Sequence, residues 1–208
     1  MTSRPKASKV KQQNKLINTA AKLLSEYEKH GFGYVAQGER GVFGERSLSP
    51  STFKTSFDVS DFEAPFVENK SNTFGVKTKF SGSVLFHGRT STNDISLINT
   101  HPINKRGWSL IHNGVVSNHG PKYEMTTTND TEHLVEYLST VGVSGIEQHL
   151  SGYYAIAAIA PDGITHILRD DTATLFVARV DSIDSYIIAT TETHNPIVTG
   201  KQIGRAHV

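Results

Sequence analysis

The run YYAIAAIA, residues 153–160, restricts the fold more than any other stretch of this chain. A strand with one solvated face alternates apolar and polar side chains, whereas this run is apolar at consecutive positions. Such a strand is covered on both faces. Shorter apolar runs separated by turn residues surround it, so the pattern favours two stacked antiparallel sheets with helices on the outside.

The remaining elements are amphipathic helices and hairpin strands. Apolar residues at helical spacing predict a helix over residues 11–30, with Gly31 as its C-cap. Asn129 as N-cap, with Glu132 three residues on, predicts a second helix, and a short third helix begins at Ser144. Further strands are expected in GYVAQ, GVFGERSLS, SVLFHGR, ITHILRD, TLFVARV and SYIIATT. This order indicates an α+β fold, a four-layer αββα sandwich of two antiparallel sheets.

A short stretch in the middle of the chain, WSLIHNGVVSN (residues 108–118), carries an Asn-Gly step between two apolar runs. Asn-Gly tolerates the positive φ angles of a type I′ turn. The stretch is therefore predicted to be a β-hairpin with Asn113 and Gly114 at its tip.

Composition excludes several classes of protein. The chain has no cysteine, so disulfides, Cys-based metal sites and a Cys nucleophile are absent from its 208 residues. No apolar run approaches the roughly 18 residues that span a bilayer, and no secretory segment follows the basic start. A cytoplasmic protein without a membrane partner is expected. The net charge of +1 predicts no nucleic-acid partner; the basic first fifteen residues are interpreted as a solvated arm, with a nucleic-acid-binding tail as the alternative.

Polar residues suited to chemistry gather in the middle third of the chain. They are His87, Arg89, Thr92, His101, His112, Asn113, Asp130 and Glu132. Three histidines with Asp94 or Asp130 could hold a divalent ion, but no compact ligand spacing is present and no metal is expected. A purely structural interpretation would make these residues a turn, a helix start and a surface ion pair.

Taken together and in order, five motifs point elsewhere. They are HGRTST (87–92), NTHPI (99–103), LIHNGVVSN (110–118), NDTEHLVEYL (129–138) and GYYAIAAI (152–159). In this order they resemble the class II glutamine amidotransferase domain, a member of the N-terminal nucleophile hydrolases. The resemblance covers roughly residues 11–198 and implies a domain that hydrolyses glutamine to glutamate and ammonia without a cofactor. It also implies that the ammonia passes to an acceptor (synthase) domain or subunit.

The resemblance implies a role for each matching residue. Arg89 falls on the arginine that grips the glutamine α-carboxylate, and Asp130 on the aspartate that accepts its α-ammonium. The Asn113 amide and the Gly114 N–H fall on the oxyanion donors. Thr92 and His112 fall on positions of the substrate-binding set. His112 and His101 are also expected to support the loops around the site.

The start of the chain departs from the family. The family nucleophile is an N-terminal cysteine on a buried apolar strand, whereas this chain begins MTSRPKASK. We expect residues 1–202 to be a single amidotransferase domain truncated at its N-terminus, and residues 203–208 (IGRAHV) to be a non-native tail. The alternative is a catalytically inactive pseudo-amidotransferase that binds or senses glutamine. A third candidate is a hydrolase of the same fold that acts on another amide.

Overall fold

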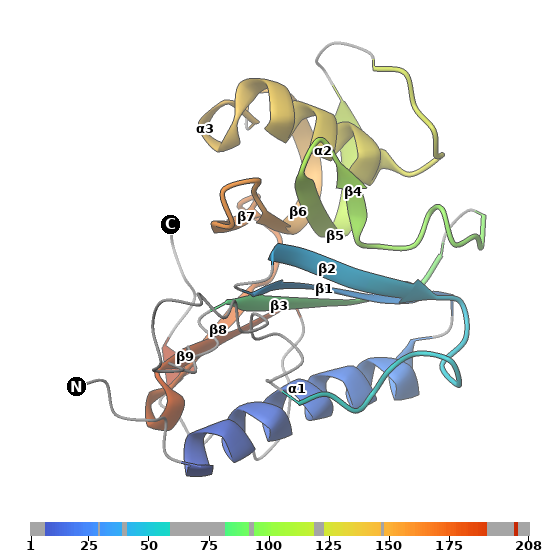
Figure 1. The fold of residues 1–208 in the computed structure, drawn as a ribbon. Helices are drawn as coiled ribbons and strands as arrows, with labels where there is room; N and C mark the ends of the chain where they lie inside the picture. The colour runs from blue at the N-terminus through green and yellow to red at the C-terminus, as the bar shows by residue number, and fades with distance from the viewer. Residues whose placement is uncertain are drawn as a thin grey trace, which may run out of the picture.

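The apolar runs of the chain form antiparallel sheets in a computed structural model. It describes residues 7–28, 30–38, 41–58, 82–91, 94–118, 123–146, 148–190 and 202–203. The first sheet contains β1 (Phe32–Gly38), β2 (Gly41–Ser47) and β3 (Ser83–Gly88), in the order β2-β1-β3. Helix α1 (Ala7–Tyr27) lies along one face of this sheet (Figure 1). Ala21 of the helix packs there against Phe32 and Tyr34 of β1. Phe53 and Phe57, from the loop after β2, complete this cluster.

The second sheet is built from a continuous part of the chain. It contains β4 (Ile103–Lys105), β5 (Trp108–Asn118), β6 (Leu150–Ile159) and β7 (Thr165–Arg169), in that order. Helices α2 (Asp130–Val141) and α3 (Val143–Ile146) cover its outer face. Leu134, Tyr137 and Leu138 of α2 are buried there against Leu110 and Ile156.

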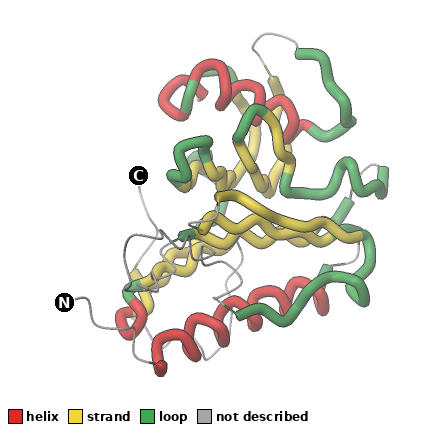
Figure 2. Tube along the Cα trace, viewed as in Figure 1, coloured by secondary structure: helices red, strands yellow, loops and turns green. Residues whose placement is uncertain are grey.

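The two sheets face each other across an apolar seam. Val35 of β1, Leu85 of β3 and Ile159 of β6 form its buried centre, with Ile111 and Ala157 packed against them. The layers therefore run α1, first sheet, second sheet, α2 with α3, and Figure 2 shows the strands between the helices. The predicted α+β class and sandwich of antiparallel sheets are confirmed.

A third, small sheet lies beside the first. It contains β8 (Phe176–Val180), β9 (Ser185–Ala189) and β10 (Gln202–Ile203), in the order β10-β8-β9. The 3-10 helix η2 (Asp181–Ile183) joins β8 to β9, and Ser182 Oγ donates to Gln12 Oε1 of α1 (2.8 Å). Ile203, the first residue of the expected tail, pairs with Val177, while 204–208 lie outside the described residues.

Helix α1 differs from its predicted bounds. It begins at Ala7, ends at Tyr27 and does not reach Gly31, so Gly31 is not its C-cap. The backbone near Gly31 instead pairs with the end of β3: the Arg89 N–H donates to the Gly31 carbonyl (2.8 Å), and the His30 N–H to the Arg89 carbonyl (3.1 Å). A Cβ on Gly31 would lie 2.8 Å from Thr100 Oγ1, so close approach explains this glycine.

The predicted hairpin at Asn113-Gly114 is wrong. Residues Trp108–Asn118 form one unbroken strand, β5, which pairs along its whole length with β6. The chain turns before β5, where Arg106 (φ 51°) and Gly107 (φ 81°) have positive φ angles. The long ladder with β6 outweighs the local turn preference of Asn-Gly.

Helix α2 begins as predicted. Asn129 is the N-cap, and its side chain accepts a hydrogen bond from the Thr131 N–H (3.0 Å). Glu132 does not reach back to the Asn129 N–H as in a capping box; it binds the N–H groups of Thr126 and Thr127.

Among the helices of the described residues, none is long and apolar enough to cross a bilayer.

Candidate functional site

Arg89 follows β3 directly and is fixed by its own main chain. Its N–H and carbonyl bond the segment between α1 and β1, as described above, and its guanidinium Nη1 donates to the Asp94 carbonyl (2.9 Å). Only 8% of the residue is exposed. Burial lowers the pKa of Arg89, and the negative charges of Asp94 and Asp130 oppose this. Asp130, which the resemblance pairs with Arg89, is thus one of the two charges that favour the protonated guanidinium.

Asn113 and Gly114 lie in the middle of β5. The Asn113 side chain lies on the face turned toward the first sheet, because Ile111, two residues earlier, packs into the seam between the sheets. Its Nδ2 donates to Thr190 Oγ1 (3.0 Å), just beyond the end of β9. The predicted donor is exposed, and its amide is oriented by Thr190.

Gly114 has its N–H directed away from β6. It is opposite Tyr154 in the ladder, where opposed residues alternate between pairs that exchange hydrogen bonds and pairs that do not. The Tyr154 N–H donates to Asp170 Oδ1 (2.8 Å), and its carbonyl accepts from the Asp170 N–H (3.0 Å). Because these groups face away from β5, Gly114 and Tyr154 form a non-hydrogen-bonded pair. The Gly114 N–H consequently points to the other edge of β5.

Side chains occupy this edge where β4 stops. The β4 ladder extends along β5 only as far as Leu110. Beyond it, the His112 N–H donates to His101 Nδ1 (3.3 Å), and the Val116 N–H donates to Asp130 Oδ2 (3.0 Å). Gly114 lies between them on the same edge. Asp130 is therefore placed next to the Gly114 N–H by a hydrogen bond to the strand itself.

Three histidines gather behind this edge, of which His101 and His112 are buried and His87 is partly buried. The rings of His87 and His101 are 4.1 Å apart, and His87 Nε2 donates to the His112 carbonyl (2.9 Å). His101 contacts Thr131 Oγ1 and Asn129 Nδ2 through Nε2 (2.9 and 3.1 Å). Burial lowers the pKa of His87 to about 4 and the pKa of His101 well below its usual range. These rings are neutral at pH 7 and can act as hydrogen-bond supports.

His112 is buried on the side of β5 that faces α2. Its Nδ1 lies 3.3 Å from Thr131 Oγ1 and 3.9 Å from Asp130 Oδ1. Burial lowers the pKa of His112, and the charge of Asp130 opposes this. In the described part of the chain, no group of three or more His, Cys, Asp or Glu side chains is arranged to hold a metal ion.

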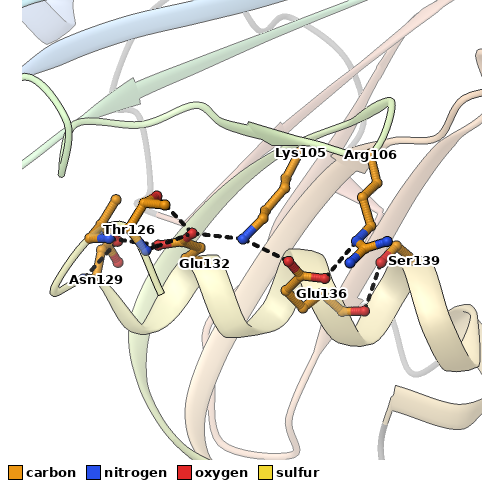
Figure 3. Close-up of polar contacts among 8 residues, drawn as sticks. Lys105, Arg106, Thr126, Asn129, Glu132, Glu136 and Ser139 are labelled. Atoms are coloured by element: carbon orange, nitrogen blue, oxygen red, sulfur yellow. Dashed lines mark hydrogen bonds and ion pairs between the residues drawn. The ribbon is translucent and has the colours of Figure 1, made fainter. Parts of the chain in front are cut away.

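A charged cluster between α2 and the β4–β5 turn contains Glu132, Glu136, Lys105 and Arg106 (Figure 3). Of these four residues, only Glu132 was singled out from the sequence. Lys105 Nζ lies 2.9 Å from Glu132 Oε1 and 2.6 Å from Glu136 Oε1, and Arg106 Nε donates to Glu136 Oε2 (2.8 Å). Glu132 and Glu136 are four residues apart, so they share one face of α2, and because both carboxylates are buried they need partners.

The structure thus brings Arg89, His112, Gly114 and Asp130 to one region around the edge of β5, with Asn113 on the adjoining face. Thr92 lies outside the described residues. A cavity of about 380 Å³ opens elsewhere, between β2 and the β4–β5 turn, and none of these residues lines it.

Comparison with known proteins adds information on the fold. No family model and no curated protein matches the sequence. One similar solved structure is glutamine phosphoribosylpyrophosphate amidotransferase from B. subtilis complexed with ADP and GMP, with 17% identity, a TM-score of 0.56, and coverage of 86% of this chain and 39% of that one. Another is the allosteric regulatory enzyme of purine biosynthesis, with 17% identity, a TM-score of 0.56, and coverage of 85% and 39%. The chain shares their fold and spans about 39% of their length.

Proposed function

We propose that this domain binds glutamine and is the glutaminase part of a class II amidotransferase. Arg89 binds the α-carboxylate through its planar guanidinium, and Asp130 accepts the α-ammonium. The observation that carries the proposal is the edge of β5, where the Gly114 N–H points outward beside the Asp130 carboxylate. A backbone donor next to an ammonium acceptor suits an amino acid whose side-chain amide develops negative charge on oxygen.

The proposed chemistry requires a nucleophile that is not among the 208 residues. In it, a cysteine thiol adds to the glutamine amide carbon, ammonia leaves with the thiol proton, and water hydrolyses the thioester to glutamate. Asn113 Nδ2 and the Gly114 N–H stabilise the tetrahedral oxyanion, a contribution of about 3 kcal/mol for a single donor. His101 and His112 hold the edge of β5 in place. The ammonia then passes to an acceptor on another domain or subunit.

One experiment tests this proposal. Ammonia release from glutamine is measured for the 208-residue chain and for a form extended at its N-terminus by an apolar strand beginning Met-Cys-Gly. Mass spectrometry first confirms the N-terminal residue. We expect release only from the extended form, and Asn113→Ala in that form lowers kcat by roughly 10²–10³. Robust turnover by the short chain that is lost in Thr2→Ala would contradict the proposal, because Thr2 would then be the nucleophile.

The second candidate is a domain that binds glutamine without hydrolysing it. The engagement of Asn113 Nδ2 by Thr190 favours it, because this amide already has an acceptor within the protein. Binding of glutamine by both forms, with no ammonia from either, would select this candidate.

A further inference from the structure

Glu132 is a buried carboxylate with partners on both sides. It is 1% exposed and lies in the first turn of α2. On one side it accepts hydrogen bonds from the Thr126 N–H, the Thr126 hydroxyl (2.8 Å) and the Thr127 N–H (2.8 Å). On the other side it binds Lys105 Nζ (2.9 Å). Burial alone would raise the pKa of Glu132, but these hydrogen bonds outweigh it and lower the pKa to about 2.

These contacts join three segments of the chain. Residues 126–127 precede α2, Lys105 lies at the end of β4, and Glu132 belongs to α2 itself (Figure 3). Glu136, one turn along the helix, adds contacts to Lys105 and Arg106 but not to residues 126–127. The first turn of α2 is therefore held between the preceding loop and the β4–β5 turn by Glu132.

Asp130 depends on the placement of that same turn. It is the first residue of α2, and its Oδ2 accepts the Val116 N–H on the edge of β5. Its side chain is 35% exposed, so packing around it does little to fix its position. A shift of the helix start would move the carboxylate along the edge of β5 and break the bond to Val116.

We propose that Glu132 is a positioning residue, which together with Lys105 sets where the Asp130 carboxylate lies on the edge of β5. The importance of this for ligand recognition rests on the proposed function. Glu132→Gln keeps the shape of the side chain but removes the charge and replaces one oxygen by an amide donor. Because Lys105 donates to Oε1 and the Thr127 N–H to Oε2, the single remaining oxygen cannot accept from both. The matched control is Glu136→Gln, which makes the same change one turn away, shares only Lys105 with Glu132 and leaves the contacts of Glu132 with residues 126–127 in place.

The test is amide hydrogen exchange measured by NMR on the protein without ligand. The reporter is the Val116 N–H, and the internal reference is the Tyr154 N–H, which bonds Asp170 on the opposite side of the sheet. In Glu132→Gln and Asp130→Ala, we expect exchange at Val116 to become about tenfold faster or more relative to Tyr154, as loss of a charge-assisted bond requires. In Glu136→Gln, we expect the ratio to stay within about twofold of wild type.

Three results would overturn the positioning role. They are an unchanged ratio in Glu132→Gln, equal acceleration of both amides, and equal effects of Glu132→Gln and Glu136→Gln. A separate arm measures binding of glutamine and of glutaramate, which is glutamine without its α-amine, to the same variants of the Cys-extended form. Loss of glutamine binding alone in Glu132→Gln and Asp130→Ala supports the role. Unchanged binding in Asp130→Ala would refute the proposed function, while the exchange result still decides the role of Glu132.

Discussion

Arg89 is held in place by the protein before any ligand arrives. Its main chain bonds the segment before β1, and Nη1 bonds the Asp94 carbonyl. A side chain fixed in this way loses little conformational entropy when it binds a carboxylate. In the Cys-extended form, Arg89→Lys should weaken glutamine binding nearly as much as Arg89→Ala, because an ammonium lacks the two parallel donors of the fork. Isothermal titration calorimetry checks this; glutamine affinity within about twofold of wild type in both variants would remove Arg89 from the site.

The pKa of His87 predicts how stability varies with pH. The pKa is about 4 in the folded protein and 6.5 for an ordinary histidine, so between these values the unfolded chain binds more protons. Stability is therefore full above about pH 6.5 and falls, by up to about 3 kcal/mol, as the pH drops to 4. Urea unfolding from pH 7.5 to 4.5 should show this loss. His87→Gln, which keeps a donor for the His112 carbonyl, should show a smaller one; identical pH profiles would contradict the assignment to His87.

At the scale of elements, the sequence predicted what local patterns determine. Strands form at the predicted runs YYAIAAIA and SVLFHGR, and α2 begins after its predicted N-cap, Asn129. Predictions failed where distant segments decide the outcome: Asn113-Gly114 is paired with β6, and the backbone at Gly31 is paired with β3. The partners of Glu132 and the Asn113–Thr190 contact also depend on packing, which spacing along a single chain does not encode.

The backbone of β5 predicts a cost for any side chain at Gly114. Its φ is +137°, and a Cβ there would lie 2.0 Å from the Tyr153 carbonyl oxygen. Gly114→Ala should therefore lower the free energy of unfolding by about 3 kcal/mol or more, since strain and a backbone clash add. The control is Gly41→Ala, where φ is +107° but nothing lies within 4 Å. Chemical denaturation of both variants measures the difference; equal losses would mean that strain alone matters at Gly114.

For the whole molecule, the seam between the sheets carries the layered architecture. Ile159 is fully buried in it beside Val35 and Leu85. Ile159→Ala should lower the free energy of unfolding by about 2–5 kcal/mol, the range for truncation of a buried aliphatic side chain. The matched control is Ile164→Ala, because Ile164 is 55% exposed, and a change within about 0.5 kcal/mol is expected. Thermal denaturation distinguishes the two variants. Similar losses of unfolding free energy in both would mean that the seam is not the core that stabilises the fold.

The seam also divides the proposed ligand contacts. Arg89 follows β3 of the first sheet, whereas Asp130 begins the helix that covers the second sheet. A glutamine held by both residues would cross-link the two halves of the sandwich. Every tenfold excess of ligand over its Kd would then raise the free energy of unfolding by about 1.4 kcal/mol. The thermal stability of the protein would consequently rise with the concentration of the proposed ligand.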